Sequence, residues 1–490
     1  MHRKASSVSG PGGESSSVAR VKSTALRVFR TIRPSRGEAA SFGPPTVPQT
    51  TYIPIKSGDS RASEEDHIGK LPPELWLKIF RFAAEVSELT NSLQPDYANP
   101  RYRFKTNAQD VTKRSLLLVC RQWYHLATPI SYEAIRFPIM FILQKFLDLS
   151  SALSKANSSA SIGRYLKHLD ITVRPHSGIP MACVSELLQE TPNLLTFFAN
   201  MDRNLTDPIP LFNLLPSRLT HLHIQEYGYN PERWTISLSD LLDFLNSHPN
   251  LSSISLPFKF APDSDPSRIA QNRSWSSIRK WTFQDSSQIV TLVSQLPSGA
   301  LPNLTEAEFG NGLATHLPCS LHDIRLFLAA HGKSLVSVCL YQADGESMLK
   351  LSQTLRSINR LCLHIAEINV AFVGYFPPFE LPRSLTTGQF RMPRIVSLGI
   401  WFSYDFLEDR IHVQQYHRAV ASPWPELFPN LTRIRLLEEQ DVDVYRAHDQ
   451  LTRQGLLNPF RRATCLVVVE DISGTVLGEL TKGICTLVDR

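Results

Sequence analysis

The chain has 490 residues, 42% of them hydrophobic and 20% charged, which is typical of a globular protein large enough for two or more domains. Its net charge of +6 comes from residues 1–36, which hold eight Lys and Arg against one acid, whereas the other 454 residues carry 43 basic and 44 acidic side chains. The remainder therefore offers no general attraction to nucleic acid. The sequence has no run of 18 apolar residues, so it predicts no membrane span. Seven cysteines without a CxxC pair favour a reduced compartment.

Residues 1–66 are rich in Ser, Gly, Pro and Arg, and we expect them to form a disordered basic tail. One stretch of this tail, "VARVKSTALRVFRTIR", is Arg-rich, nearly free of acids and weakly amphipathic. A mitochondrial presequence or a nuclear signal has the same character. The tail is thus either a simple solvated segment or an address, and the expected location is the cytoplasm or nucleus, with mitochondria as the alternative.

The stretch "LPPELWLKIF" at 71–80 predicts a short helix, because Pro72 and Pro73 suit a helix entrance and Glu74 complements the positive end of the helix dipole. Apolar side chains cover more than half of its circumference. A surface helix needs an apolar stripe of only about 100° to face its own core. The helix is therefore either central in a large core, or packed on its own domain with one side and on a partner with the other.

A second segment at 115–137 has the spacing of an amphipathic helix, carried by Leu116, Val119, Cys120, Trp123 and Leu126. We expect Cys120 to be a small buried thiol on the apolar side of this helix. Pro129 then ends or bends the helix. Residues 67–137 thus predict an all-α module, either a helical hairpin or three helices, that is interrupted by the irregular segment 84–114.

The two segments "LPPELWLKIF" and "LLLVCRQWYHLA" resemble the F-box, whose pattern is Leu-Pro-x-Glu-Leu followed later by Leu-x-x-Val-Cys-Arg/Lys-x-Trp. The resemblance implies docking on the Skp adaptor and, through it, on a cullin. It implies that the residues that face the adaptor or set that surface are Leu71, Pro72, Glu74, Leu75, Ile79, Phe80, Leu116, Val119, Cys120 and Trp123. The segment 84–114 is longer than the family's usual link. As a surface loop it leaves docking intact, and lying across the first helix it puts docking in doubt.

In residues 138–490 a pattern of apolar residues at i, i+3 and i+5 recurs about ten times, at spacings of 23 to 37 residues. The copies start at Leu166, Leu194, Leu219, Leu251, Ile278, Leu304, Leu335, Ile358, Ile395 and Leu431. Four of them begin with Pro-Asn-Leu, and plausible helices lie between them, such as 183–190, 238–248, 287–296, 321–332 and 347–358. A strand and a helix stacked repeatedly predict a parallel sheet with helices on one face. The pattern resembles the irregular leucine-rich repeats often found behind F-boxes.

The predicted fold is therefore α/β: a disordered tail, a small all-α module and a leucine-rich-repeat-like α/β solenoid, with a non-repeat α/β domain as the alternative. We expect residues 137–149 to cap the first repeat and residues 464–471 to form a last buried strand. The segment 371–385, rich in Pro and aromatic residues, is either a binding loop or a packed capping loop.

No motif of an enzyme is present: there is no G-x-S-x-G, G-x-x-x-x-G-K-[ST], G-x-G-x-x-G or H-E-x-x-H. We expect no catalytic residue, no cofactor and no metal ion. His221 and His223 lie two apart on one predicted strand and could begin a metal site, but no third ligand is identifiable from spacing. Exposed strand histidines are the simpler interpretation.

The resemblance to the F-box implies a substrate-receptor subunit of a ubiquitin ligase, which holds a target protein, and the alternative is a repeat scaffold with the helical module as its cap. Alternation along the strands places polar side chains on the concave face of the solenoid. There, Glu306 and Glu308 are expected to form an acidic region and the arginines a basic one. We predict that the target binds at Tyr341, Arg360, Trp401, Arg433 and Arg435.

Overall fold

The computed structural model describes most of the chain after residue 70, and all described residues belong to one compact unit, Ile68–Arg490. The described ranges are 71–84, 106–137, 140–156, 162–171, 181–201, 208–226, 235–262, 274–310, 319–342, 347–372, 390–402, 424–437, 467–471, 476–481 and 484–487. The predicted tail, 1–66, lies outside them. None of the described helices is long and apolar enough to cross a bilayer.

The helices follow in chain order. Three come before the first strand: α2 (Pro73–Ala83), α4 (Thr106–Leu118) and α5 (Arg121–Ser131). The others are α6 (Met140–Ala156), α7 (Met181–Gln189), α8 (Ile209–Leu214), α9 (Leu238–Ser247), α10 (Ser286–Gln295), α11 (Leu321–His331), α12 (Ser347–Leu361) and α15 (Trp424–Leu427), with short 3₁₀ turns η3 (Ile162–Tyr165) and η5 (Gly332–Ser334). The five helices expected between repeats all form, as α7, α9, α10, α11 and α12, which confirms that part of the prediction.

Fourteen strands of the described residues form one sheet, and a further pair, β5 (Thr235–Ser237) with β7 (Lys259–Ala261), forms a second one. The strands of the large sheet are β1 (Ala134–Arg136), β2 (His168–Ile171), β3 (Thr196–Met201), β4 (His221–Glu226), β6 (Ser253–Leu256), β8 (Lys280–Phe283), β9 (Glu306–Phe309), β10 (Ser337–Gln342), β11 (Glu367–Phe372), β12 (Ser397–Phe402), β13 (Arg433–Leu436), β14 (Val467–Asp471), β15 (Val476–Thr481) and β16 (Ile484–Leu487). From β1 to β14 every pairing is parallel and follows chain order, as a strand–helix repeat requires.

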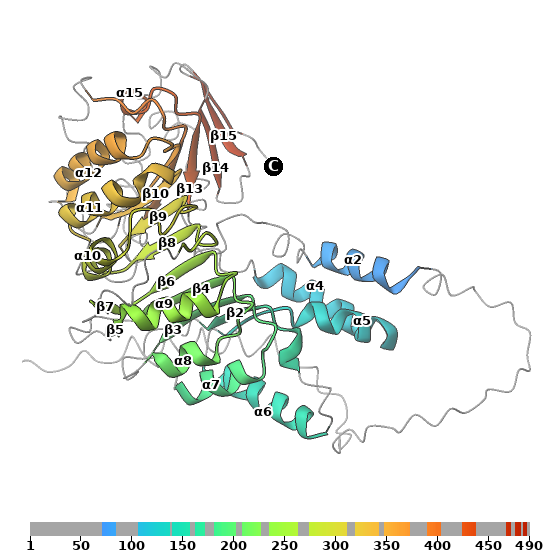
Figure 1. Ribbon diagram of the computed structural model, residues 1–490. Coiled ribbons are helices and arrows are strands. Elements are labelled where there is room, and N and C mark those ends of the chain that lie inside the picture. Colours follow the sequence, from blue (N-terminus) through green and yellow to red (C-terminus); the bar gives the residue numbers. More distant parts are fainter. Residues whose placement is uncertain are drawn as a thin grey trace, which may run out of the picture. The chain divides into compact units, whose positions relative to one another are not determined.

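The helix face of the sheet is closed. The apolar residues of each repeat, such as Leu222, Trp281 and Leu398, align across neighbouring strands and are buried in one continuous core with the helices. Figure 1 shows α9, α10, α11 and α12 along one side of the strands. The opposite side of the sheet, called here the open face, carries the alternating polar residues. The prediction of an α/β fold with a long parallel sheet and helices is confirmed.

Two strand predictions need correction. The copy at Ile358 is wrong, because Ile358 lies in α12, and the strand β11 belongs to a copy with Ile365, Ile368 and Val370 at i, i+3 and i+5. This moves the repeat starts to 335, 365 and 395, so that both intervals are 30 residues. The strand expected within 464–471 forms as β14, but it is not the last one, since β15 and β16 follow it with antiparallel pairing.

Candidate functional site

The helices α2, α4 and α5 share a small core of their own. Phe80 is fully buried, and its ring lies 5.7 Å from that of Trp76 and 4.7 Å from that of Trp123, between ring centroids. The remaining buried members of this cluster are Ala84, Leu116, Ala127 and Ile130. Aromatic pairs at these separations are attractive beyond the apolar area that they bury. Within the described residues of this region, three helices thus pack on one another.

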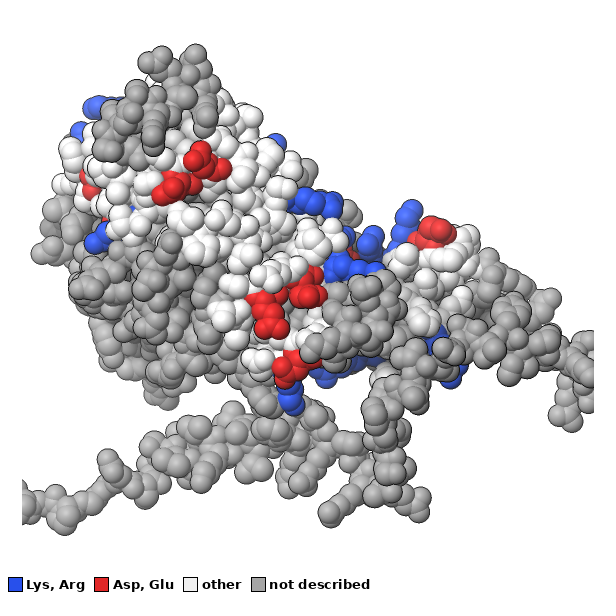
Figure 2. Space-filling model, turned by 60° about the horizontal axis from the view of Figure 1, so that its bottom comes forward, with Lys and Arg blue, Asp and Glu red and all other residues white. Residues whose placement is uncertain are grey.

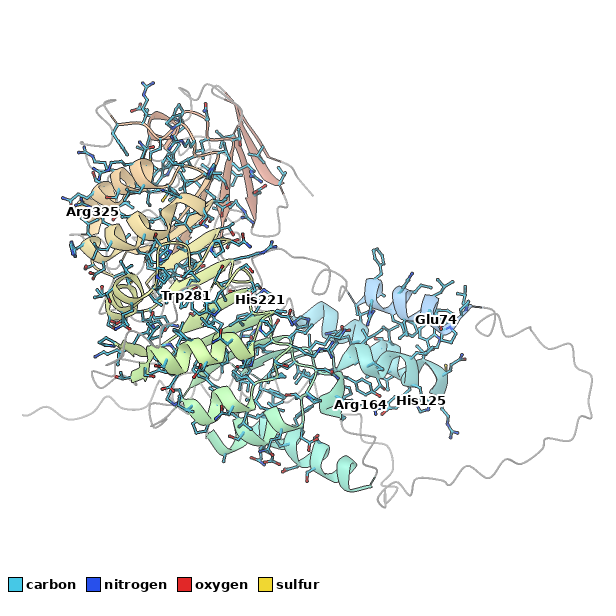
Figure 3. All side chains as sticks on the ribbon, viewed as in Figure 1. Glu74, His125, Arg164, His221, Trp281 and Arg325 are labelled. Carbon is cyan, nitrogen blue, oxygen red and sulfur yellow. The ribbon has the colours of Figure 1, made fainter. Side chains whose placement is uncertain are left out.

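The other side of α2 remains uncovered. Leu75, Ile79 and Phe82 recur every three or four residues of α2, so they share one side of the helix, and Leu71 lies just before its first turn. We call these four residues the outer face of α2. Their exposed fractions run from 38% for Leu71 to 80% for Phe82. Pro72 and Glu74 are exposed as well, and Figure 3 labels Glu74 on this helix. An exposed apolar face of this kind, which none of the described elements covers, is uncommon on a monomeric protein.

The second predicted segment is two helices rather than one. The chain breaks between α4 and α5 at Cys120, which has an extended backbone, and the Cys120 Sγ accepts a hydrogen bond from the Trp123 amide at 3.5 Å. Cys120 is therefore the N-cap of α5 and is exposed, so the expectation of a buried thiol is wrong. Val119 is exposed beside it. Leu118, which sequence reasoning passed over, is 84% exposed.

The ten residues predicted to face the adaptor or to set its surface thus divide into two groups. Phe80 and Leu116 are buried in the core of the helices, and Trp123 is partly buried against it, so these three hold the helices together. The exposed ones are Leu71, Pro72, Glu74, Leu75, Ile79, Val119 and Cys120. Sequence reasoning left out Phe82, although its apolar character at three residues after Ile79 was the signal that places it on the outer face of α2.

Part of the predicted insertion 84–114 is helical, because α4 begins at Thr106 and packs on α5. Residues 85–105 lie outside the described residues, so the choice between a surface loop and a segment across α2 stays a prediction. On the side towards the sheet, the buried carboxylate of Glu133 lies 3.7 Å from Arg81 of α2 and 2.5 Å from Lys167. These ion pairs connect the helices to the first strands.

On the open face of the sheet, the polar residues of successive strands stand in two rows, as alternation predicts. The first row runs through His168, Thr196, His221, Ser253, Lys280, Glu306, Ser337, Glu367, Ser397 and Arg433. The second row lies two residues further along each strand and includes Asp170, His223, Thr282, Glu308, Asn369 and Arg435. Many of these polar side chains are buried, because neighbours on adjacent strands crowd them.

A lysine offsets part of the expected acidic region on this face. The Lys280 Nζ lies 2.7 Å from the Glu308 carboxylate and 3.8 Å from that of Glu306, and the Thr282 hydroxyl donates to Glu308 at 2.7 Å. Lys280 and Glu308 are both buried. Close pairing in a buried site cancels much of the outward field of Glu308. One lysine and two carboxylates leave one net negative charge, so the acidic region around Glu306 and Glu308 is weaker than the sequence suggested.

The expected basic region is offset in the same way at Arg435, whose guanidinium lies 3.6 Å from Glu367 and 3.4 Å from Glu470. The Asn369 amide also donates to Glu367, at 2.8 Å. Gly399 stands between Asn369 and Leu437, and a Cβ at this position would collide with the Asn369 Oδ1. On the open face, ion pairs across strands thus hold Lys280 and Arg435, which lie among uncharged polar residues, and Arg433 remains exposed.

Four of the five predicted target-binding residues come together on the open face. Trp401 packs edge-to-face on Tyr341, with ring centroids 5.8 Å apart, in a small cluster with Ala371 and Leu437. Trp401 is only 4% exposed, whereas Tyr341 is half-buried. Arg435 is next to this cluster and Arg433 is exposed in the neighbouring row. The fifth, Arg360, is wrongly placed by the sequence, because it lies exposed in the last turn of α12 and not on a strand.

The strand histidines are not the exposed residues that the sequence suggested. His223 is buried, and burial lowers the pKa of His168 to about 3 and that of His221 to about 4. The nearby charge of Lys280 lowers the pKa of His221 further. Figure 3 labels His221 on the sheet. Within the ranges that the structure describes, no group of three or more His, Cys, Asp or Glu is placed to hold a metal ion.

The described residues thus define an α/β repeat protein with three N-terminal helices. No protein-family model matches the chain, and no curated protein does. Among solved structures, the crystal structure of the Rad7 and Elc1 complex in yeast is similar over 78% of this chain and 94% of that chain, with 13% sequence identity and a TM-score of 0.27. A likeness of this size carries no argument about function. Of the predicted loop 371–385, Ala371 and Phe372 end β11, and the remaining residues lie outside the described residues.

Proposed function

We propose that this chain is the substrate-receptor subunit of a Skp-cullin-F-box type ubiquitin ligase. Its α2, α4 and α5 helices act as the F-box and dock on the Skp adaptor, and the repeats bind a target protein. The single observation that carries the proposal is the outer face of α2, where Leu71, Leu75, Ile79 and Phe82 remain exposed although the helices already have a closed core.

Burial of the outer face of α2 against a partner is energetically favourable. Complete burial of a Leu or Ile side chain is worth about 1.5 to 3 kcal/mol relative to exposure. Leu75 and Ile79 retain close to half of their possible exposure, so a partner that covers the outer face of α2 gains several kcal/mol from a few residues. Micromolar binding corresponds to about 8 kcal/mol. The outer face of α2 is thus able to anchor an adaptor.

In this role the chain performs no chemistry and needs no cofactor. It raises the effective concentration of the target near the charged conjugating enzyme, which reaches it through the adaptor and the cullin. We place the target on the open face around Tyr341 and Arg433, next to the buried Trp401 and the partly buried Arg435. Arg360 is left out, because it projects from α12.

Co-purification with the Skp adaptor tests the proposal. Changing Leu71, Leu75 and Ile79 together to alanine is expected to weaken adaptor binding more than about a hundredfold, since the loss of three partly buried contacts exceeds about 3 kcal/mol. The matched control is Val290→Ala with Leu326→Ala, two exposed apolar residues on α10 and α11. This control is expected to bind the adaptor normally.

Unchanged adaptor binding by the triple variant, or no binding by the natural chain, contradicts the proposal and leaves the repeat scaffold as the better interpretation. In the same preparations, Arg433→Ala is expected to lower ubiquitylation of the target while the adaptor remains bound, because Arg433 is exposed and lies far along the sheet from α2.

A further inference from the structure

The turns that lead into the strands form one edge of the large sheet, and they alternate in kind. Four of them contain Pro-Asn-Leu, before β3, β6, β9 and β13. The turns before β2, β4, β8, β10 and β12 lack this sequence and carry cations instead, and the turn before β11, residues 362–366, has neither Pro-Asn-Leu nor a Lys or Arg. These cations, called here the basic edge, are Arg164, Arg218, Arg279, Lys333, Arg391 and Arg394. In the spatial order of the sheet, a cationic turn therefore occurs at every second strand from β2 to β12.

The asparagines of the neutral turns hold the cationic turns in place. The side-chain amides of Asn193, Asn303 and Asn430 each donate, at 2.7 Å, to a backbone carbonyl of the preceding turn. The carbonyl that Asn193 binds is that of Arg164, and the Arg218 guanidinium donates to Asn193 at 2.9 Å. Because these hydrogen bonds fix the turns, ligand binding costs little backbone entropy at the cationic residues.

The basic edge has one sign of charge. All six of its residues are exposed, and none of them makes an ion pair with another described residue. The ten turns that precede β2 to β13 contain one acid, Glu190, and one further cation, Lys167, which is already paired with Glu133. Uncompensated like charges at fixed positions repel one another and favour an anionic partner.

Stabilisation of helix C-termini explains little of this arrangement. A cation interacts favourably with the helix dipole only within the last turn of a helix. Lys333 follows α11 directly, but Arg164 lies within the four-residue 3₁₀ turn η3 and Arg218 follows the short α8. No described helix ends within ten residues of Arg279 or Arg391. The basic edge therefore needs another explanation than helix capping.

The spacing of the basic edge fits an extended polypeptide. Neighbouring strands are about 4.8 Å apart, so cationic turns at alternate strands recur about every 9.6 Å. A polyproline-II segment rises about 3.1 Å per residue with three residues per turn, and it presents every third side chain on one side at about 9.3 Å. Acidic residues at every third position of such a segment would thus meet successive cationic turns.

A nucleic acid fits the basic edge less well. Single-stranded nucleic acids are bound by cations together with exposed aromatic platforms for the bases. The described rings in the cationic turns, Tyr165, Trp275 and Phe390, are buried or half-buried, and the Arg164 guanidinium already lies 4.8 Å from the Tyr165 ring centroid. Beyond residue 36 the chain has 43 basic and 44 acidic residues. On the face drawn in Figure 2, Lys and Arg lie in small separate groups among neutral and acidic residues, and not in one broad field.

We propose that the basic edge binds an acidic segment of a partner protein in an extended conformation, with an acidic side chain at about every third residue. This binding uses no residue of the outer face of α2, so it is independent of adaptor docking and goes beyond the proposed function. We assign the segment to another chain, because the acidic runs of this one, such as 64–66 and 438–443, nowhere place three acidic residues in a row at every third position.

A labelled peptide provides the test, with the full chain and fluorescence anisotropy at about 50 mM salt, where surface charges are weakly screened. The peptide is about 13 residues long, with Glu at every third position and Pro and Ser between, because eight strand spacings span roughly 38 Å. The triple variant Arg279→Glu, Lys333→Glu and Arg391→Glu is expected to bind at least about tenfold more weakly. The matched control Arg325→Glu, on α11 (Figure 3), is expected to change binding less than about twofold.

Thermal unfolding of the triple variant verifies its fold, since its three positions are exposed. The single variant Arg279→Ala is expected to weaken binding in the same direction and to lower the salt dependence. Equal binding of the peptide by the natural chain and the triple variant overturns the proposal. Equal binding of a peptide with its Glu residues in one block overturns the extended, spaced arrangement, and tighter binding of a single-stranded DNA that the triple variant loses overturns the assignment to a polypeptide.

Discussion

The repeat sheet and the α2 helix differ in how far their apolar side chains are buried. On the helix face of the sheet, apolar residues such as Leu222 and Trp281 are covered by the repeat's own helices. On α2, Phe80 is covered, but Leu75, Ile79 and Phe82 are not. The repeats therefore bury their apolar side chains within the chain, whereas α2 carries more apolar surface than its small core covers. Changes to the first region should affect folding, and changes to the second should affect association.

The largest effect is expected in the repeat core. Trp281 is almost fully buried and its ring stacks on Phe283, with centroids 5.8 Å apart. Trp281→Ala leaves a large cavity and is expected to lower the free energy of unfolding by about 3 to 5 kcal/mol, as measured by denaturant titration. A loss below about 1 kcal/mol would mean that the core collapses around the cavity, and the contrast with α2 would then fail.

A smaller effect is expected from acid, because the open face buries neutral histidines. In the unfolded chain a histidine has a pKa near 6.5, and in the folded protein the pKa is about 3 for His168 and about 4 for His221. The unfolded state therefore binds more protons below pH 6.5, so stability is full above that pH and falls as the pH drops towards 4. Each histidine is expected to cost about 2 kcal/mol at pH 5.

Denaturant titrations at pH 7 and pH 5 measure this effect, and His168→Gln provides the comparison. The variant keeps a polar side chain beside Thr196, whose Oγ1 lies 3.1 Å from the His168 Nδ1. It is expected to remove about half of the difference between the two pH values. The same pH dependence in the variant and the natural protein would show that other groups cause it.

The smallest effect is expected on α2. Leu75→Ala with Ile79→Ala is expected to change the free energy of unfolding of the isolated chain by less than about 0.5 kcal/mol per residue, because both side chains are exposed. Denaturant titrations of the double variant and of the natural chain, each alone and with the adaptor, measure the effect on folding and the effect on adaptor binding. A loss as large as that of Trp281→Ala would mean that these residues pack within the chain.

The sequence was sufficient for most of the repeat, because the i, i+3, i+5 pattern needs only alternation along a buried strand. The prediction failed at 358–363. There Leu351, Leu355 and Ile358 are the buried residues of α12, and the i, i+3 spacing of a helix has the same first step as the strand pattern. The regular interval of 30 residues between starts at 335, 365 and 395 was the signal that could have corrected it.

The charge pairs of the open face could not be predicted strand by strand. They form between strands, so Lys280 meets Glu306 and Glu308 only when the register is known. Alignment of the repeats on their apolar positions would have given that register. The break at Cys120 had no comparable signal, because cysteine is an uncommon N-cap and the apolar spacing runs through it.

The antiparallel pair β15–β16 has a consequence for the length of the protein. An uncapped parallel sheet presents unpaired backbone groups at its edge, and another strand, from this chain or from a neighbouring molecule, can add there. Both end strands are short, since β16 has four residues and runs antiparallel to its neighbour, and β1 has three, and short edge strands offer few unpaired groups for another strand. Both ends are therefore poor templates for fibrous growth, while an inner unit between them can be duplicated or lost in evolution without creating a new edge.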